Sequence, residues 1–373
     1  MIKVMEAISD MNVGGAGRLL ISRIKYSDKD NFKYTVILPK KSLLIPFLKN
    51  VGANVIEIDA CQNRSIDITS LIVLCKIIKA CSPDILNSHA CFSARIAGRI
   101  SGVKVNLHTR HCDFPIKDIY RLPLFKQMIS FINNALSDGV IAVSSSAKRN
   151  LLQLGVNNAK IKIIINGAEK IKELNYEQKK KIKAGLNIPA DAIVVSIFAR
   201  LEVYKDHVTF LRAAKVLSKF DKIYFLIVGN GSLEKELKKY AKKLGLEKKV
   251  IFLGFVEDVS EIMNITDVNV NCSIGTETSS LALSEGMSLG IPAIASDYLG
   301  NKYIVKDGIN GLIFEQRDYI GLAKRILLLY GDKNLYAKLS KNSKQRFLNE
   351  LNAKRMTLET ENYYMSALKS KTF

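Results

Sequence analysis

The chain has 373 residues, of which 48% are hydrophobic and 24% are charged. This composition is that of a globular protein, and it excludes disordered, collagen-like and coiled-coil chains. Lys and Arg outnumber Asp and Glu by 21, with +12 in residues 1–173 and +9 in residues 174–373. Such dispersed charge favours anionic partners in general: nucleotides, phospholipid head groups or nucleic acid. The length predicts two domains or one large one.

The amino-terminal residues 1–8 are typical of a short buried strand and not of a signal peptide. The sequence has no run of 18 or more apolar residues, so no membrane span is expected. Six cysteines show neither a CxxC pair nor zinc-ligand spacing: Cys61, Cys75, Cys81, Cys91, Cys112 and Cys272. They indicate reduced thiols in a cytoplasmic protein, for which peripheral attachment to the inner face of the cell membrane stays open.

The first half of the chain alternates short β-rich runs with helical stretches. The runs predict strands at Tyr34–Leu38, Asn54–Ile58, Ile85–Asn87, Val103–His108 and Gly139–Val143. Helices are predicted between them, for example at Gly17–Tyr26 and Ile68–Cys81. Alternating strands and helices imply a parallel sheet with right-handed crossovers.

The same pattern restarts near residue 190. Ala192–Phe198 is a nearly continuous apolar run, as expected of a parallel strand buried on both faces. Further strands are predicted at Ile223–Val228, Val250–Leu253, Asp267–Asn271 and Pro292–Ser296, and helices at Asp206–Phe220, Leu233–Leu244 and Leu351–Leu368. Two such series predict an α/β protein of two doubly wound, Rossmann-like domains that face each other across an interdomain cleft.

The domain boundary is predicted within Lys170–Asn187, a charged and weakly patterned stretch after an Asn-Gly turn. We expect an amino-terminal domain over residues 1–175 and a carboxy-terminal domain over residues 176–355. A last helix over residues 356–373 is expected to pack back onto the first domain.

The helix at Leu233–Leu244 carries five lysines. Its apolar residues recur at helical spacing, so one face belongs to the core and the lysines form the solvated face. A nucleic-acid site would interleave basic residues with exposed aromatic ones, or belong to a known module, and neither pattern is found. We therefore expect no nucleic-acid partner.

The most informative stretch, Cys272–Pro292, follows a predicted buried strand and runs through a hydroxyl-rich loop into a helix. Gly290 and Pro292 end that helix. The loop brings backbone N–H groups and hydroxyls to a helix N-terminus, which suits a diphosphate. Its central residues are Thr278, Ser279, Ser280 and Leu281. Glu277 precedes the helix and Glu285 lies inside it, so the two carboxylates are spaced to hold two ends of one extended ligand.

Five segments, in this order along nearly the whole chain, resemble one known family. They are Asn12–Gly17, Ile165-Asn166-Gly167, Ala199-Arg200-Leu201 with Lys205, Glu277-x7-Glu285 with Gly290-Ile291-Pro292, and Asp307–Leu312. The set resembles the retaining GT-B glycosyltransferases of family 4.

The resemblance implies a nucleotide diphosphate sugar as the donor, with uridine favoured, bound mainly by the second domain. Arg200 and Lys205 would neutralise the departing diphosphate, so no metal ion or other cofactor is expected. Glu285 would hold the ribose hydroxyls, and Glu277 would lie near the transferred sugar in a front-face reaction. The alternative for these carboxylates is helix capping and a solvated side chain. Gly14 and Gly15 would let the backbone approach the donor.

The family also places a histidine near the sugar and the acceptor. We favour His111 over His108 as this catalytic residue, with Arg110 between them and His89 as a weaker candidate on the acceptor side. The alternative for each histidine is a capping or core role. The sequence departs from the family at Gly17, where a Glu is common, and at Leu299 and Tyr303.

The acceptor is expected to be a glycan or a lipid-linked sugar in the assembly of a bacterial surface polysaccharide. Residues 114–126 mix apolar, aromatic and basic types, and we expect them either to face an acceptor or an anionic membrane surface, or to form a core-packed helix with a basic outer face. Two alternatives to transfer stay open: a GT-B-fold sugar-nucleotide epimerase and a non-catalytic nucleotide-sugar-binding subunit.

Overall fold

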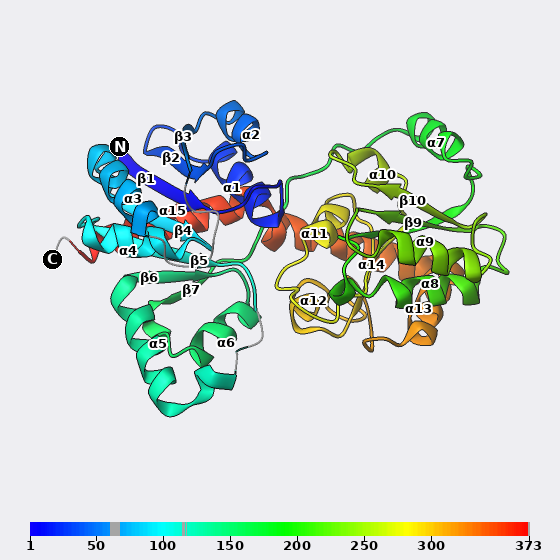
Figure 1. Ribbon diagram of the computed structural model, residues 1–373. Coiled ribbons are helices and arrows are strands. Elements are labelled where there is room, and N and C mark those ends of the chain that lie inside the picture. Colours follow the sequence, from blue (N-terminus) through cyan, green and yellow to red (C-terminus); the bar gives the residue numbers. More distant parts are fainter. Residues whose placement is uncertain (60–67, 114–115, 117, 372–373) are drawn as a thin grey trace. The chain divides into compact units, whose positions relative to one another are not determined.

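The computed structural model describes residues 1–59, 68–113, 116 and 118–371, so Cys61, Phe114, Pro115 and Lys117 lie outside the described residues. The chain forms two compact units (Figure 1). Unit 1 combines Met1–Gly167 with the carboxy-terminal helix α15 (Ala353–Lys369), and unit 2 is Ala168–Asn352. Residues 168–175, which we expected in the first domain, join unit 2 because Ile171 N donates to Ser288 Oγ at 3.1 Å and Leu174 N to Asn264 Oδ1 at 2.8 Å.

Unit 1 contains a seven-stranded parallel sheet in the order β3-β2-β1-β4-β5-β6-β7. Its strands are β1 (Ile2–Ile8), β2 (Phe32–Pro39), β3 (Asn54–Ile58), β4 (Ile85–His89), β5 (Val105–Arg110), β6 (Gly139–Ala142) and β7 (Ile161–Ile163). The crossovers hold α1 (Gly15–Lys25), α2 (Ile45–Asn50), α3 (Ile68–Cys81), α4 (Phe92–Ile100), α5 (Pro123–Leu136) and α6 (Ser145–Gln153). Short 3₁₀ turns lie at Asp118–Arg121 and Asn158–Lys160.

The two faces of this sheet differ in polarity. Met5, Ala7 and Leu86 face an apolar layer to which α3 and α4 contribute. Because successive side chains of a strand point to opposite faces, Glu6, which is paired in register with Asn87, lies on the other face. Helices α1 and α15 pack against each other. Each sends a polar side chain, Arg23 and Tyr364, to Glu6 on that second face.

Unit 2 contains a six-stranded parallel sheet in the order β10-β9-β8-β11-β12-β13. Its strands are β8 (Ile193–Phe198), β9 (Ile223–Val228), β10 (Val250–Gly254), β11 (Val268–Asn271), β12 (Ala293–Ser296) and β13 (Gly311–Phe314). The helices are α7 (Tyr176–Gly185), α8 (His207–Leu217), α9 (Glu234–Lys243), α10 (Ser260–Asn264), α11 (Leu281–Ser288), α12 (Leu299–Ile304), α13 (Tyr319–Gly331) and α14 (Lys333–Arg346). A 3₁₀ turn, Val203–Lys205, precedes α8, and a π-helical turn, Phe347–Leu351, follows α14.

The core of unit 2 explains why these segments fold as they do. Alternate residues of β8 and β9 pack against α8 and α13, and Phe210 meets Phe225 edge-on with ring centroids 5.7 Å apart. Local signals fix the helix starts: Asn175 begins α7 with a capping box, and Ser280 begins α11 by accepting a hydrogen bond from Leu283 N.

The predicted fold, two Rossmann-like domains with parallel sheets, is confirmed. Strands Asn54–Ile58 and Ile223–Val228 and helix Ile68–Cys81 match their predicted bounds. The lysines of α9 are exposed while Leu237 and Ala241 are buried, which confirms the solvated face. The sequence did not show the short strands β7 and β13. Among the residues that the structure describes, no helix is long and apolar enough to cross a membrane.

Candidate functional site

In unit 2, two basic residues and an aromatic ring gather just past the carboxyl end of β8. Arg200 donates to Tyr204 Oη at 2.6 Å. The Arg200 guanidinium lies 5.8 Å and the Lys205 ammonium 5.6 Å from the centroid of the Tyr204 ring. The 3₁₀ turn before α8 therefore holds both cations on one aromatic side chain, at the edge where sheets of this kind bind ligands.

Glu277 meets this cluster from the loop that follows β11. Its carboxylate forms an ion pair with Lys205, and both side chains are largely buried, with 11% and 14% exposed. Oε2 also accepts from Asn271 Nδ2 and Ser273 Oγ, each at 3.2 Å. Burial alone would raise the pKa of Glu277, but Lys205 and these two donors lower it below its ordinary value. Glu277 is therefore an ionised carboxylate that three donor groups hold in place.

The support for Glu277 comes from the next strand and helix. Asn301 donates to Asn271 Oδ1 at 3.3 Å and to Ser296 Oγ at 2.9 Å. Gly300 in α12 lies so close to the backbone of Glu277 that a Cβ atom at position 300 would come within 1.9 Å of the Glu277 carbonyl oxygen. The segment 297–303, where the sequence departs from the family, thus packs under the Glu277 loop.

The hydroxyl-rich loop continues from Glu277 into α11. Thr278, Ser279 and Ser280 are all buried, and Ser280 caps the helix. Leu281 is its first residue, and Glu285, half-buried, lies one turn further along. The structure brings Arg200, Lys205 and Glu277 into one cluster, whereas Glu285 stands farther along α11.

Several contacts of this cluster were not predicted from the sequence. Tyr204, Asn271 and Ser273 were not singled out, although each touches a predicted site residue. The turn Gly229–Gly231 was missed as well. A Cβ at Gly229 would lie 2.1 Å from the Ala199 carbonyl oxygen, so this glycine lets the turn pack beside Arg200. The Gly-x-Gly pattern directly after an apolar strand was the available signal.

In unit 1, the glycine-rich turn precedes α1. Gly14 caps the helix and is exposed, and a Cβ there would meet only Asp10 Oδ2, at 3.8 Å. Gly15, also exposed, begins the helix. Gly17 differs: a Cβ there would lie 2.4 Å from the Leu44 side chain. The family's Glu would collide with Leu44, so Gly17 is a packing residue in this chain.

A buried polar network lies on the second face of the unit 1 sheet. Glu6 is fully buried and forms an ion pair with Arg23 at 2.7 Å. His89 Nε2 lies 2.7 Å from Glu6 Oε2, and Tyr364 Oη from α15 donates to Oε1 at 3.0 Å. Burial raises the pKa of Glu6, yet Arg23 and the hydrogen bonds bring it below its ordinary value. The carboxylate is therefore ionised inside the sheet–helix interface.

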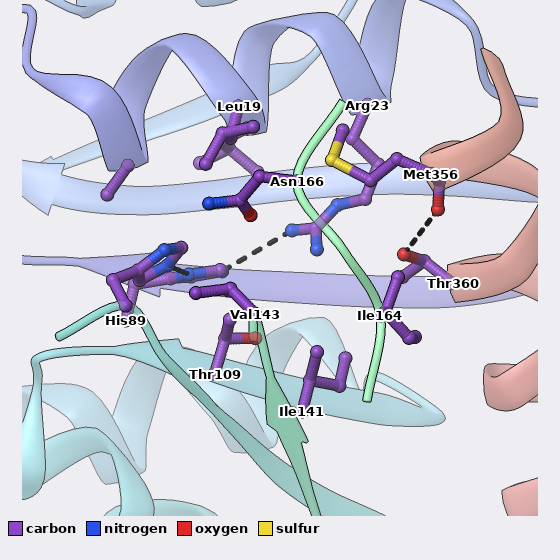
Figure 2. A pocket seen from close by; sticks show the side chains of 13 residues that line it. Leu19, Arg23, His89, Thr109, Ile141, Val143, Ile164, Asn166, Met356 and Thr360 are labelled. Carbon is purple, nitrogen blue, oxygen red and sulfur yellow. Dashed lines mark hydrogen bonds between the residues drawn. The ribbon is translucent and has the colours of Figure 1, made fainter. Parts of the chain in front are cut away.

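His111 follows β5 and joins this network. Its Nε2 lies 2.7 Å from His89 Nδ1, and the two rings stack with centroids 5.0 Å apart. Burial and the neighbouring cations hold the pKa of His111 well below its ordinary value, so the ring is neutral at pH 7. His89 and Arg23 point toward each other beside a cavity of about 20 Å³ that His111 also lines (Figure 2). This volume fits one water molecule or one hydroxyl group.

His108 and Arg110 lie on the opposite face of β5. Thr109 between them bonds to Asn87 on the network side, at 3.0 Å. His108 Nδ1 lies 3.1 Å from Ser137 Oγ, and Arg110 donates to Asn150 Oδ1 at 2.7 Å. Burial, together with Arg95 and Arg110, keeps the pKa of His108 well below its usual range. The alternation of β5 thus separates His108 from the network that holds His89 and His111.

Within the described part of the chain, no group of three or more His, Cys, Asp or Glu side chains is placed to hold a metal ion. The charged groups described above are organised around Lys205 in unit 2 and around Arg23 in unit 1.

Comparison with known proteins assigns both halves of the chain. Residues 13–170 match the family model described as Glycosyltransferase Family 4, and residues 178–346 match that of Glycosyl transferases group 1. The chain is 26% identical over 372 residues to the UDP-Gal:alpha-D-GlcNAc-diphosphoundecaprenol alpha-1,3-galactosyltransferase of Escherichia coli, a match that covers 96% of this chain and 95% of that protein.

A second relative is 36% identical over 156 residues. It is the GalNAc-alpha-(1->4)-GalNAc-alpha-(1->3)-diNAcBac-PP-undecaprenol alpha-1,4-N-acetyl-D-galactosaminyltransferase of Campylobacter jejuni, and 41% of this chain and 43% of that protein are covered. Among solved structures, Anabaena HepE in complex with UDP superposes with a TM-score of 0.85 at 20% identity, covering 98% of this chain and 100% of that one. The family resemblance of the motifs is confirmed, and the chain belongs to the glycosyltransferases of the GT-B fold, with a family 4 domain followed by a group 1 domain.

Proposed function

We propose that this glycosyltransferase moves a sugar from a UDP-sugar to a lipid-linked glycan, with retention of the anomeric configuration and without a metal ion. The observation that carries the proposal is the ion pair of Lys205 with the buried Glu277, beside Arg200, at the carboxyl edge of the unit 2 sheet. The names of the relatives support the rest: the Escherichia coli enzyme is named for UDP-Gal and a diphosphoundecaprenol acceptor, and HepE binds UDP.

Arg200 and Lys205 stabilise the leaving diphosphate. As the bond between the sugar and the diphosphate breaks, negative charge grows on the β-phosphate. Fixed cations that meet this charge lower the barrier, because they need not reorganise when it develops. Thr278, Ser279, Ser280 and Leu281, at the start of α11, supply N–H groups to the same diphosphate, and Glu285 accepts from the ribose hydroxyls.

Glu277 orients the sugar and stabilises positive charge near its anomeric carbon. Three donors converge on Oε2, and a carboxylate with a lowered pKa is a weak nucleophile. This environment favours a front-face reaction in which the leaving phosphate helps to deprotonate the acceptor. In unit 1, the exposed Gly14 and Gly15 would let the donor approach the backbone, and His111 contacts a sugar hydroxyl as a neutral ring.

A thermal-shift panel of nucleotide diphosphate sugars tests the donor. The true donor and UDP raise the melting temperature by mass action, whereas GDP- and ADP-sugars leave it unchanged. NMR of the product then reads the anomeric configuration, and transfer measured with excess EDTA tests the role of metal ions. An inverted product, or loss of transfer in EDTA that Mg²⁺ restores, contradicts the corresponding part of the proposal.

We also propose that α5 of unit 1 docks on an anionic membrane surface, where a lipid-linked acceptor resides. No residue of α5 is buried. Leu124 and Phe131 are 76% and 74% exposed, and with Met128 they recur at helical spacing on one face. The exposed Lys126 and the net charge of +12 in residues 1–173 complement anionic head groups.

Vesicle co-sedimentation tests this surface. We expect binding to vesicles that contain phosphatidylglycerol at low salt, and a loss of about tenfold or more for the variant Leu124→Ser/Phe131→Ser. The control is Ile68→Ser, which removes another exposed apolar side chain of unit 1, 72% exposed, and leaves binding unchanged. Equal binding by wild type and the double variant would show that α5 is not the docking surface.

A further inference from the structure

A second cavity of unit 1, of about 200 Å³, lies at the amino edge of its sheet. Its walls come from the amino-terminal halves of β1, β2 and β3 and from the end of α3, and they include Lys3, Met5, Lys33, Thr35, Asn54 and Cys81. His89 ends β4 at the opposite edge, where it is paired with Ile8. Lys3 precedes Ile8 by five residues, which is roughly 17 Å along a strand. This cavity is therefore separate from the one that His89 and His111 line.

Two like charges lie side by side on the wall of this cavity. Lys3 in β1 is paired in register with Lys33 in β2, and such neighbouring charges repel each other. No acidic residue is among the described residues that line the cavity, and neither ammonium group has a hydrogen bond or ion pair to a described residue. Asp84, on which the charge of Lys3 acts, is held by Lys104 Nζ at 2.7 Å and by the Lys3 backbone N–H at 2.9 Å. Among the described residues, no carboxylate is thus dedicated to this pair of lysines.

The rest of the wall offers polar groups that are only weakly engaged. Asn54 lies beside Thr35 on the next strand, and its Nδ2 donates to Thr35 Oγ1 at 3.5 Å. This distance is well beyond the usual value of about 2.9–3.0 Å, so the amide and the hydroxyl keep most of their capacity to bond with a ligand. Met5 and Pro83, both buried, add an apolar side. Charged, polar and apolar groups therefore meet in one cavity, as they do in sites that bind small molecules.

We propose that this cavity binds a small phosphate monoester, with its phosphate group between Lys3 and Lys33 and the remainder against Asn54 and Thr35. A phosphate monoester carries about −1.5 to −2 charges at pH 7, which matches two ammonium groups. A cavity of about 150 Å³ holds benzene, so about 200 Å³ has room for a slightly larger molecule and not for a nucleotide sugar. The site is thus distinct from a donor site, and the proposal does not depend on the proposed function.

Cys81 lines the cavity and can report its occupancy. Its thiol is free and half-buried, and so is that of Cys75 on the same helix, which does not line the cavity and serves as the control. Alkylation by the uncharged reagent N-ethylmaleimide is followed at both positions by peptide mass spectrometry, at constant ionic strength. A phosphate monoester at ten times its Kd should slow alkylation of Cys81 about tenfold by mass action and leave Cys75 unchanged. Equal slowing at both positions would overturn the proposal.

The same assay distinguishes two sources of the phosphate monoester. Glycerol 3-phosphate is the soluble probe, and vesicles that contain phosphatidic acid present the same group on a lipid, with phosphatidylcholine vesicles as their control. Protection of Cys81 by glycerol 3-phosphate identifies a free small molecule as the ligand. Protection by phosphatidic acid vesicles alone identifies a lipid head group. If neither probe protects Cys81, the cavity is not a phosphate site and the proposal fails.

Substitution of the lysines tests where the phosphate binds. Lys3→Met/Lys33→Met should abolish the protection of Cys81, and Lys33→Met alone should weaken binding roughly tenfold or more. The matched control, Lys40→Met/Lys41→Met, lowers the net charge by the same amount at the opposite end of β2 and should keep the protection. Protection that persists without Lys3 and Lys33 would contradict the assigned contacts.

Stability separates a loss of binding from a loss of folding. Because the two lysines repel each other, Lys3→Met/Lys33→Met should be at least as stable as the wild type without ligand, and it should gain no stability from the ligand that protects the wild type. A lower stability without ligand would contradict the repulsion on which the proposal rests. Saturating UDP is present throughout, so that the added phosphate does not report on the proposed diphosphate site of unit 2. If UDP does not bind, the proposed function fails, whereas Cys81, which lies within unit 1, still decides whether the cavity binds phosphate.

Discussion

Replacing Lys205 and replacing Glu277 should have different effects on UDP binding, although both changes break the same ion pair and lower stability. Replacing Glu277 with Gln leaves a largely buried ammonium without its carboxylate. Breaking a buried pair costs about 3–5 kcal/mol, and we expect the lower end because 14% of the Lys205 side chain is exposed. Replacing both residues, as Glu277→Gln/Lys205→Met, leaves no unpaired charge, so the double variant should lose less stability than the two single losses added together.

Binding of UDP should separate the same two residues. In the proposed complex, Lys205→Met removes a charge-assisted contact to the diphosphate worth about 1.5–3 kcal/mol, so UDP binding should weaken roughly 10- to 100-fold. Glu277→Gln removes an anion that competes with the diphosphate for Lys205, so UDP should bind at least as tightly as to the wild type. Turnover of Glu277→Gln should nevertheless fall about 100-fold, because the proposed role of the lost charge is to act on the sugar in the transition state.

Calorimetric titration of UDP and initial rates with the identified donor measure both effects. Stability is read from the unfolding transition that UDP shifts, because a chain of two units need not unfold in one step. The control is Lys238→Met, which removes a surface lysine paired with Glu234 in α9 and should change each quantity by no more than about 0.5 kcal/mol. Wild-type turnover in Glu277→Gln, or wild-type UDP affinity in Lys205→Met, would refute the assigned roles.

Two further variants probe unit 2. His207 is buried, neither ring nitrogen has a hydrogen-bond partner in the described structure, and burial, aided by Lys205, lowers its pKa from 6.5 to about 4. As the pH falls below 6.5, the unfolded chain therefore binds a proton at His207 that the folded chain does not bind. This difference lowers the free energy of unfolding by about 2 kcal/mol at pH 5 and by almost nothing at pH 7. Denaturant titrations should show His207→Leu gaining stability relative to wild type between pH 7 and pH 5, and an unchanged difference would contradict the assigned burial. Gly300→Ala places a Cβ 1.9 Å from the Glu277 carbonyl oxygen and should lower turnover at least tenfold. The control is Gly275→Ala, whose Cβ would lie 3.5 Å from the Tyr204 Cβ and should change turnover by no more than about twofold. Equal rates for the two variants would mean that the Glu277 loop tolerates displacement.

Periodicity and family motifs together predicted most of the fold and the unit 2 cluster. The apolar run Ala192–Phe198 indicated a buried strand, and the motif placed Arg200 and Lys205 just after it, where the structure has them. The supporting residues carry no such signal. Asn271 lies at the end of β11 as one polar residue among many, and only the fold shows that its amide reaches Glu277.

The histidine near β5 shows where motif reasoning needs the strand pairing. His108 and His111 lie three residues apart, and the family pattern favoured His111 by position alone. The register of β4 with β5 places Thr109 beside His89, and strand alternation then puts His108 on the opposite face. Such an argument requires strand positions that are correct to within one residue. The sequence patterns predicted this strand at Val103–His108, whereas the structure has β5 at Val105–Arg110.

The network around Glu6 could not have been found from the sequence at all. Its members come from β1, α1, β4 and α15, and Tyr364 and Glu6 are 358 positions apart. No local pattern marks a glutamate inside an apolar strand as one that a carboxy-terminal helix will satisfy. The composition of Ile2–Ile8 even argues for an ordinary core strand, since five of its seven residues are apolar.

The Glu6–Arg23 and Glu277–Lys205 pairs differ in a way that fits different tasks. Glu6 and Arg23 are 0% and 7% exposed, and the guanidinium is a rigid, permanently charged group that rarely changes partners. Glu277 and Lys205 are more accessible, and an ammonium on a flexible stem can turn from a carboxylate to an arriving phosphate. The first pair therefore suits a fixed scaffold inside unit 1. The second suits a contact that is exchanged during each catalytic cycle, which is why the diphosphate and Glu277 should compete for Lys205.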